Sequence, residues 1–236
     1  MSRERLQFQA LIRMAGAGQL RPIVTKLRER LWSDATFYCL RRDLDLPFEP
    51  PAPKIPVTVR KATQEDARSL FALNLPGISP DEVLERVSRM SLFQSGIPTF
   101  YVGVTADNKP CYVQWLMAAS ENARLQEHFH GLFPLLAPDE ALLEGAFTPE
   151  SYRGLGIMGY ATARIAEKAR ELGARYVLTF ADANNIPSLK GGQRAGFVPY
   201  SIRRSAWRGF RLHVVFTPLP AGSRYPFEIE PASRPA

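Results

Sequence analysis

Several residue types and patterns that define whole classes of protein are scarce or missing here. Only two of the 236 residues are cysteine, Cys39 and Cys111, which excludes a disulfide framework and a four-thiolate zinc site. We expect both to be buried apolar residues. No run of about 18 uncharged apolar residues is present, so we expect no membrane-spanning helix. The apolar stretch over residues 6–14 is short and interrupted, which argues against a secretion signal and favours a cytoplasmic protein.

The composition that remains is typical of a folded domain with appendages. Hydrophobic residues make up 45% of the chain and charged residues 22%, which excludes a wholly disordered protein. The net charge of +7 is concentrated at the ends: residues 1–34 hold seven Lys and Arg against three Asp and Glu, and residues 201–236 hold six Arg against two Glu. Basic ends favour either a solubilising surface or an anionic partner such as a phosphate, a nucleotide, acidic lipid or nucleic acid.

A cluster of prolines divides the chain. Residues 1–34 predict two short helices, the second amphipathic and suited either to packing on the main domain or to peripheral membrane contact. Residues 35–41 have the composition of an edge strand. Five prolines between residues 47 and 56 then predict an extended linker. We therefore expect an N-terminal extension over 1–54, a domain over 55–217 and an irregular proline-rich tail over 218–236.

From residue 55 onward, the hydrophobic pattern predicts strands and helices in the order β-α-α-β-β-β-α-β-α-β. Thr63 with Asp66, and Ser79 with Pro80, have the arrangement of helix N-termini. The expected strands cover residues 57–60, 100–104, 112–117, 142–147, 176–180 and 211–216, and the later helices cover 80–90, 157–172 and about 186–195. This order predicts a mixed α/β or α+β fold, in which a mixed sheet is flanked by helices.

Residues 144–157 are where the sequence indicates chemistry. A strand ends near residue 147, a loop with Arg153, Gly154 and Gly156 follows, and a helix begins at residue 157. Glycines let backbone N–H groups approach an anion, a helix start adds free N–H groups, and Arg153 adds a positive charge. The loop therefore has the makings of a pyrophosphate cradle, although a tight strand–helix turn also uses glycine. A phosphate loop of the nucleotide-triphosphatase type is excluded, because no Gly-Lys-Ser/Thr follows.

Further motifs follow this loop in a fixed order, with a helix and a strand between the first motif and the second. The motifs are Tyr152-Arg-Gly-Leu-Gly-Ile157, then Asn185-Ile-Pro-Ser188, then Ala195-Gly-Phe197. In this order and at this spacing, the chain resembles the GNAT superfamily of acyl-CoA-dependent N-acyltransferases over about residues 57–216. The resemblance implies a GNAT-like central sheet, mixed and mostly antiparallel, with the N-terminal helical extension added to it.

The resemblance also implies a donor, acetyl-CoA, and no metal. The loop backbone would bind the pyrophosphate of coenzyme A, while the strand end and the later helix start would contact the pantetheine arm. The donor-binding residues implied in this way are Phe147, Thr148, Arg153, Gly154, Leu155, Gly156, Ile157, Met158, Asn185 and Ser188. Considered without the resemblance, Asn185 has the position of a helix N-cap, and the two roles are compatible.

Two positions depart from the family pattern. The position of Met158 is usually occupied by a small residue, so its side chain is expected to press on the phosphate loop, with Gly159 in partial compensation. Many members have a tyrosine four residues before the Gly-Phe pair, where it protonates the departing thiolate, but Gly192 stands there. The acid is then another group or water. Tyr160 and Tyr200 are near this motif only in sequence.

The mechanism implied by the resemblance is direct attack of an amine on the thioester. An alkyl amine with a pKa of ~10 is mostly protonated at neutral pH, so a base helps. The resemblance points to Glu144, three residues before the strand end, whose apolar neighbours are expected to raise its pKa. The alternative is a Glu that faces solvent or an Arg. The acceptor side would be formed by the early helices, over residues 63–90, and by late strand loops.

The expected function is transfer of an acetyl or other short acyl group from coenzyme A to a primary amine of an unidentified acceptor, which the basic ends favour as anionic. The alternative is a non-catalytic acyl-CoA-binding or sensing module of the same fold. No groove-reading motif is present, so we expect no nucleic acid partner. His128 and His130 would lie on one side of an extended segment. With no third ligand nearby, a substrate-loop or surface role is favoured over a metal pair.

Overall fold

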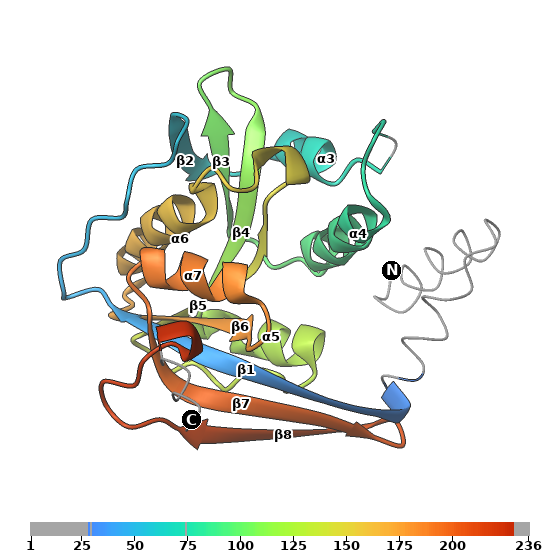
Figure 1. The fold of residues 1–236 in the computed structure, drawn as a ribbon, viewed down its shortest axis with the longest axis vertical. Helices are drawn as coiled ribbons and strands as arrows, with labels where there is room; N and C mark the ends of the chain where they lie inside the picture. The colour runs from blue at the N-terminus through green and yellow to red at the C-terminus, as the bar shows by residue number, and fades with distance from the viewer. Residues whose placement is uncertain (1–27, 29, 74, 229–236) are drawn as a thin grey trace, which may run out of the picture.

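The strands of the chain form one eight-stranded sheet in the order β2-β3-β4-β5-β6-β1-β7-β8 (Figure 1). The structure is a computed structural model that describes residues 28, 30–73 and 75–228. Neighbouring strands run antiparallel, except for β5 and β6, which run parallel. The sheet is thus mixed and mostly antiparallel, with helices on both faces, as expected. The helical extension expected over residues 1–34 falls almost entirely outside the described residues.

Each expected strand and helix from residue 57 onward is present, with small changes at the ends. The strands are β1 (Trp32–Asp43), β2 (Val57–Lys61), β3 (Phe100–Thr105), β4 (Pro110–Ala118), β5 (Glu140–Phe147), β6 (Tyr176–Asp182), β7 (Val198–Arg208) and β8 (Arg211–Pro218). The helices are α3 (Gln64–Leu70), α4 (Pro80–Gln94), α5 (Asn122–Phe129), α6 (Ile157–Lys168) and α7 (Ile186–Arg194).

Two helix starts show why these segments become helical. The Thr63 side chain accepts a hydrogen bond from the Asp66 backbone N–H, and the Asp66 carboxylate accepts one from the Thr63 N–H, which completes a capping box at α3. At α4, Ser79 accepts from the N–H of Glu82, and Pro80 occupies the first turn. Both N-caps are therefore confirmed. The helix α4 ends at Gln94, about one turn beyond the expected end at residue 90.

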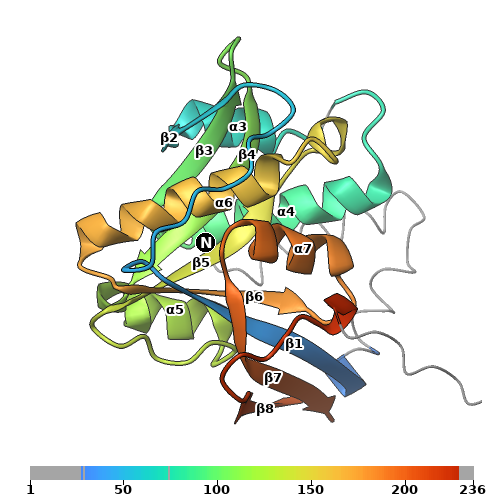
Figure 2. The same ribbon diagram turned by 60° about the vertical axis from the view of Figure 1, so that its left-hand side comes forward.

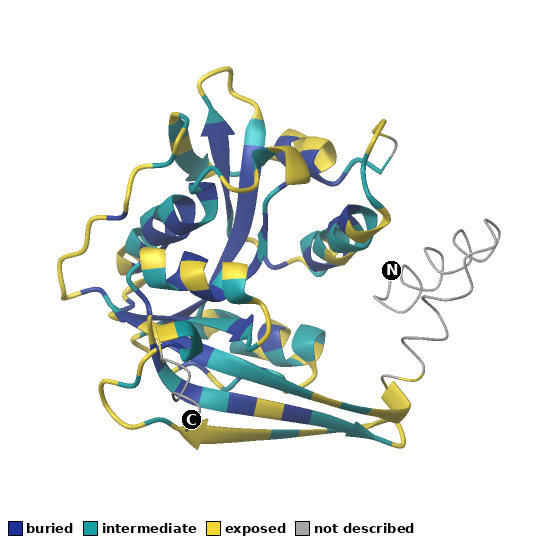
Figure 3. Ribbon diagram, viewed as in Figure 1, coloured by how far each residue is buried: buried dark blue, intermediate teal, exposed yellow. Residues whose placement is uncertain are grey.

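The sheet is covered on both faces because successive side chains of a strand point to opposite sides. Along β4, Tyr112 and Leu116 join the core under α6 and α7, whereas Val113 and Trp115 join the core under α3, α4 and α5. All four side chains are buried, so β4 is dark along its length in Figure 3. The protein thus has two cores with one sheet between them, and a residue's place in a strand determines which core it enters.

The strand β5 leaves its neighbour β6 halfway along. Parallel pairing of the two strands ends at Leu142 opposite Leu178, so β5 from residue 143 onward pairs with β4 alone. On the β4 side, the register shifts between residues 113 and 115, as in a bulge. Gly145 lies at this bulge with φ of +72°, and a Cβ there would lie 2.5 Å from Leu92 Cδ2. Glycine is therefore required at the point where β5 bends away.

The N-terminal strand β1 is longer and more central than expected. It covers Trp32–Asp43 and lies between β6 and β7, with antiparallel pairing to both. The expectation of an edge strand over residues 35–41 is therefore wrong, because both backbone edges of this segment are hydrogen-bonded. The strand belongs to the same sheet as residues 57–218, and the true edges of the sheet are β2 and the exposed β8 (Figure 3).

Two elements had no clear counterpart in the expected order. The strand β7 fills the gap between α7 and β8, and α5 gives helical structure to part of residues 119–138, which were expected to be loop or short helix. The described part of the tail, residues 219–228, is irregular apart from a short 3-10 helix at Pro226–Glu228, and Tyr225 anchors it by donating a 2.8 Å hydrogen bond to the Phe197 carbonyl. Both cysteines are buried and free, as expected.

Candidate active site

The loop between β5 and α6 presents backbone N–H groups at the start of a twelve-residue helix. Gly154 and Gly156 have φ values of +76° and +79°, a left-handed conformation that favours glycine. Gly156 is the N-cap of α6 and offers no capping side chain, so the first N–H groups of the helix lack helical partners. A Cβ on Gly154 would meet no atom within 4 Å. The exposed side of this loop suits a phosphate anion.

The proline-rich segment forms one wall of this loop. The Lys54 N–H donates a 2.8 Å hydrogen bond to the Leu155 carbonyl, and Pro53 Cα lies 3.5 Å from where a Cβ on Gly156 would stand. Figure 2 shows the chain between β1 and β2 running along α6. The segment expected as a linker thus packs on the loop and restricts its conformation.

Arg153 points back toward the strand end and α4 rather than lying free beside the loop. Its Nε donates to the Thr148 carbonyl at 3.0 Å, and its guanidinium pairs with Glu85 of α4 at 2.9 Å and lies 3.8 Å from Glu150. Its side chain is 43% exposed. The guanidinium is thus next to the loop, but two carboxylates offset its charge.

Met158 packs on α7. Its sulfur would lie 2.9 Å from a Cβ on Gly191, so the absence of a side chain at position 191 makes room for the methionine. Gly159 gives the matching space to Arg194, whose Cβ would lie 2.9 Å from a Cβ there. The compensation for a large residue at position 158 therefore comes from Gly191 of α7 rather than from Gly159.

Gly154, Gly156 and Gly159 also have the G-x-G-x-x-G spacing of a dinucleotide-binding fingerprint. In that motif, the first glycine closes a turn directly after the strand, and the third allows the helix to approach the sheet. Here residues 148–153 separate β5 from Gly154, and Gly159 meets α7 rather than a strand. The local structure therefore does not support a dinucleotide site.

The other residues expected to contact the donor already have partners within the protein. Phe147 is buried under the Arg86 guanidinium, and the Thr148 carbonyl is occupied by Arg153. Asn185 accepts a 3.1 Å hydrogen bond from the Ser188 N–H, so its N-cap role is confirmed. The first turn of α6 contacts α7 at positions 191 and 194, about two turns away from the start of α7.

No candidate for the general acid is placed clearly by the structure. A Cβ at Gly192 would lie 2.8 Å from Leu40 Cδ1 and 3.6 Å from the Tyr225 hydroxyl, so β1 and the tail fill the space of the usual tyrosine. Tyr200 is packed under the Arg41 guanidinium, and burial raises the pKa of its hydroxyl, which makes it a weak acid. Tyr160 stacks with Arg164 on α6.

Glu144 lies at the bend of β5, on the face covered by α4 and α5. Burial raises the pKa of its carboxyl, and the Gly145 N–H and the charges of Arg89 and Arg203 oppose this rise. The Gly145 N–H donates to one carboxylate oxygen at 2.9 Å. No basic side chain of the described residues forms an ion pair with Glu144. A carboxylate whose pKa is raised by burial and that has no ion-pair partner is suited to accept a proton.

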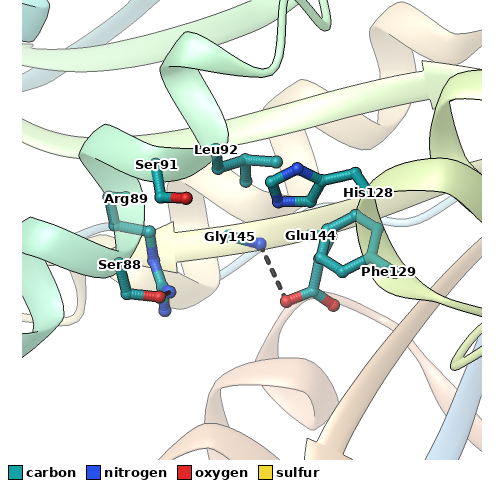
Figure 4. Close-up of a pocket in the computed structure, with 8 residues that line it drawn as sticks. All are labelled: Ser88, Arg89, Ser91, Leu92, His128, Phe129, Glu144 and Gly145. Atoms are coloured by element: carbon teal, nitrogen blue, oxygen red, sulfur yellow. Dashed lines mark hydrogen bonds between the residues drawn. The ribbon is translucent and has the colours of Figure 1, made fainter. Parts of the chain in front are cut away.

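A pocket opens beside Glu144 between α4, α5 and β5 (Figure 4). It has a volume of about 50 Å³ and is lined by Ser88, Arg89, Ser91, Leu92, His128, Phe129, Glu144 and Gly145. The Arg89 guanidinium enters it from α4, and the Glu144 carboxylate enters it from β5 (Figure 4). The structure therefore supplies a polar cavity with both signs of charge at the base expected from sequence.

Arg203 of β7 adds a buried positive charge on the same side of the sheet. It is 3% exposed and lies against the rings of Phe37, Phe133 and Phe180, at 4.0 to 5.3 Å from their centroids. Its terminal nitrogen donates to the Leu132 carbonyl at 2.9 Å. Burial lowers the pKa of Arg203, and the charge of Glu144 opposes that change. The two side chains thus stabilise each other's charged form.

The histidine pair is arranged differently from the extended pattern expected. His128 lies in α5 and lines the pocket, whereas His130 is the left-handed C-cap of that helix and is exposed, so the two do not share a side. In the part of the chain that the structure describes, no three His, Cys, Asp or Glu side chains form a group that could hold a metal ion. The described residues also contain no helix long and apolar enough to cross a membrane.

None of the pocket residues of α4 and α5 belongs to a motif that the sequence alone would identify. Ser88, Ser91 and Leu92 recur at helical spacing, but only Ser88 falls within the helix expected over 80–90, because α4 continues to Gln94. What the sequence does not contain is which strand these residues face. Only the docking of α4 on β5 brings Arg89 to Glu144.

Comparison with known proteins gives matches among solved structures alone. No protein-family model matches the sequence, and no curated protein matches it. Several of the matching structures are of GNAT-family proteins, the superfamily that the motif order resembles, at low sequence identity. A GCN5-related N-acetyltransferase from Sphaerobacter thermophilus is 16% identical with a TM-score of 0.44, over 79% of this chain and 56% of that one.

Two further matches are similar in extent. A GNAT-family acetyltransferase from Colwellia psychrerythraea is 14% identical with a TM-score of 0.47, over 86% of this chain and 62% of that one. A tandem GNAT protein from the clavulanic acid biosynthesis pathway is 16% identical with a TM-score of 0.48, over 87% of this chain and 60% of that one. The chain thus spans less than two thirds of the length of each of these three proteins.

Proposed function

We propose that the chain is an acyl-CoA-dependent N-acyltransferase, which moves an acetyl or another short acyl group from coenzyme A to a primary amine. One observation carries the proposal. The strand β5 leads into a loop with uncapped backbone N–H groups at the start of α6, on one face of the sheet, and holds the carboxylate of Glu144 on the other face. It does so where its pairing with β6 has ended.

The strand β5, the loop that follows it and the start of α7 each have a role in this reaction. The free N–H groups of the loop at Gly154, Gly156 and the first turn of α6 hold the pyrophosphate of the donor. From residue 143 to 147, β5 has no strand partner on its β6 side, and the backbone groups there that are not bonded to Glu144 or Arg89 offer hydrogen bonds to the pantetheine arm and to the carbonyl oxygen of the thioester. Asn185 and Ser188 contact the arm from the start of α7.

Acetyl-CoA supplies the activated acyl group as a thioester. Glu144 takes a proton from the acceptor, and the neutral amine nitrogen attacks the thioester carbonyl carbon. The carbon–sulfur bond then breaks, the nitrogen of the new amide gives its extra proton to water, and water supplies a proton to the leaving thiolate, since Gly192 carries no acid. Because burial raises the pKa of Glu144, activity is expected to fall as the pH is lowered through that raised value.

The first test is calorimetric titration of the full chain with acetyl-CoA. Wild type is expected to bind, and Gly156→Trp to lose binding at least 100-fold, because the indole fills the loop. Gly173→Trp is the matched control: it has the same left-handed backbone, with φ of +80°, at the other end of the same helical segment, with no atom near its Cβ. Failure of folded wild type to bind acetyl-CoA would refute the proposal.

The second candidate function is a non-catalytic acyl-CoA sensor, which the missing acid at Gly192 favours. Release of free thiol in the presence of amines separates the two. An enzyme releases thiol in many turnovers, whereas a sensor binds acetyl-CoA and releases none.

A further inference from the structure

The pocket beside Glu144 contains two opposite charges that have no ionic partners. Neither Arg89 nor Glu144 forms a salt bridge with any described residue, although the charge of Arg89 opposes the rise in the pKa of Glu144. Three other charged groups of α4 are in ion pairs: Glu82 with Arg86, and Glu85 with Arg153. An unpaired cation and an unpaired anion in one small cavity are complementary to a ligand that carries both charges.

Arg89 is held so that part of its guanidinium faces the pocket. Nε and one terminal nitrogen donate to the Ala146 carbonyl at 3.3 and 3.0 Å, and the other terminal nitrogen donates to Ser88 Oγ at 3.3 Å. These three bonds leave two of the five guanidinium N–H groups for a ligand. The bonds to β5 also fix the position of the charge relative to Glu144, two residues earlier on the same strand.

Ser91 gives an independent indication that a polar ligand belongs here. Its side chain is more than nine-tenths buried, it lines the pocket, and Oγ has no hydrogen-bond partner among the described residues. In Figure 4 this hydroxyl points into the cavity, between Arg89 and His128. A buried hydroxyl without a partner is costly unless a ligand or water completes it.

We propose that the acceptor is a small zwitterion: a primary amine that also carries a carboxylate, with the amine at Glu144, the carboxylate at Arg89 and a hydrogen bond to Ser91. This inference rests on the function proposed above and specifies its substrate class. The cavity volume of about 50 Å³ has room for only a few non-hydrogen atoms, which favours a small amino acid over a nucleotide-linked sugar.

The test uses acceptor pairs that differ only in the carboxylate. Free-thiol release from acetyl-CoA is measured with the protein L-amino acids, β-alanine and 4-aminobutanoate, each against its own carboxamide. For at least one pair we expect the acid to have at least about a tenfold higher kcat/KM than the amide. Arg89→Gln should remove this preference by raising the KM of the acid to that of its amide in the same variant, and Arg89→Lys should keep part of the preference.

Arg124→Gln is the matched control, because Arg124 lies on the neighbouring helix α5 and pairs with Glu121 outside the pocket. Equal kcat/KM for acids and amides, or a preference that survives Arg89→Gln, would overturn the proposal of a zwitterionic acceptor. The proposed acyltransferase function would be unaffected by either result. Binding of acetyl-CoA without turnover of any acid would also overturn it. Absence of both acetyl-CoA binding and turnover would instead refute the proposed function itself.

Discussion

The two sides of β5 are built in opposite ways. On the α6 side, the loop between β5 and α6 is one continuous stretch, and its glycines and the helix start determine its shape locally. On the α4 side, the pocket takes its lining from residues 88–92, 128–129 and 144–145, three segments far apart in the chain. The first side is fixed by backbone conformation and the second by packing, so substitutions should affect the two sides separately.

The largest expected effect is on the pocket side. Glu144→Gln removes the base, and kcat/KM for the amine is expected to fall ~10²- to 10⁴-fold. The affinity for acetyl-CoA should stay within about twofold, because the loop lies on the other face. Steady-state kinetics and calorimetry measure the two quantities. Glu140→Gln, on the same strand but outside the pocket, is the control and should leave kcat/KM unchanged.

Glu144→Gln should also be more stable than wild type at high pH. Burial raises the pKa of folded Glu144 above its unfolded value, so the folded state holds this proton more tightly and ionisation at higher pH destabilises the fold. Glutamine does not ionise. The melting temperature of Glu144→Gln is therefore expected to exceed that of wild type at pH 8, with the difference vanishing at pH 4. A variant that remains fully active, or less stable at pH 8, contradicts a buried catalytic base.

The same contrast explains how much of the molecule the sequence predicts. The capping box at Thr63, the N-caps at Ser79 and Asn185 and the loop at Gly154 and Gly156 depend on neighbours within a few residues, and their patterns are visible in the chain. Whether β1 lies at an edge or in the centre depends on its partners β6 and β7, more than 130 residues away.

The sequence did not clearly predict β7 and α5, and in both elements a residue depends on neighbours that are distant in the chain. In β7, Arg203 is inside the core, where three aromatic rings cover it, so the expected alternation of apolar and polar residues is broken. In α5, the Asn122 side chain exchanges hydrogen bonds with the backbone of Leu136, which fixes a short polar helix that periodicity does not reveal. Arg89 reaches its place in the same way, through docking of α4.

A smaller effect is expected where α6 meets α7. Gly191→Ala places a Cβ 2.9 Å from the Met158 sulfur and 3.1 Å from its methyl carbon. Overpacking of this size costs ~1–2 kcal/mol of unfolding free energy, and displacement of the first turn of α6 should weaken acetyl-CoA binding about fivefold. Met158→Ala in the Gly191→Ala background should recover both, whereas the two substitutions would be additive if the contact were loose. Denaturant unfolding and calorimetry on the four proteins measure this coupling.

The smallest expected effect concerns the ion pair that joins the two sides. Glu85 of α4 holds the Arg153 guanidinium at 2.9 Å, and both side chains are 43% exposed. Such a surface pair contributes up to about 1 kcal/mol, so its loss frees Arg153 for the donor phosphates at little cost to the fold. Glu85→Gln is expected to tighten acetyl-CoA binding about two- to fivefold at low salt, with the gain screened away near 1 M salt. Glu121→Gln, which breaks the Arg124 pair away from the loop, should change nothing. Unchanged or weaker binding by Glu85→Gln would mean that Arg153 serves the connection between loop and α4 and does not contact the donor.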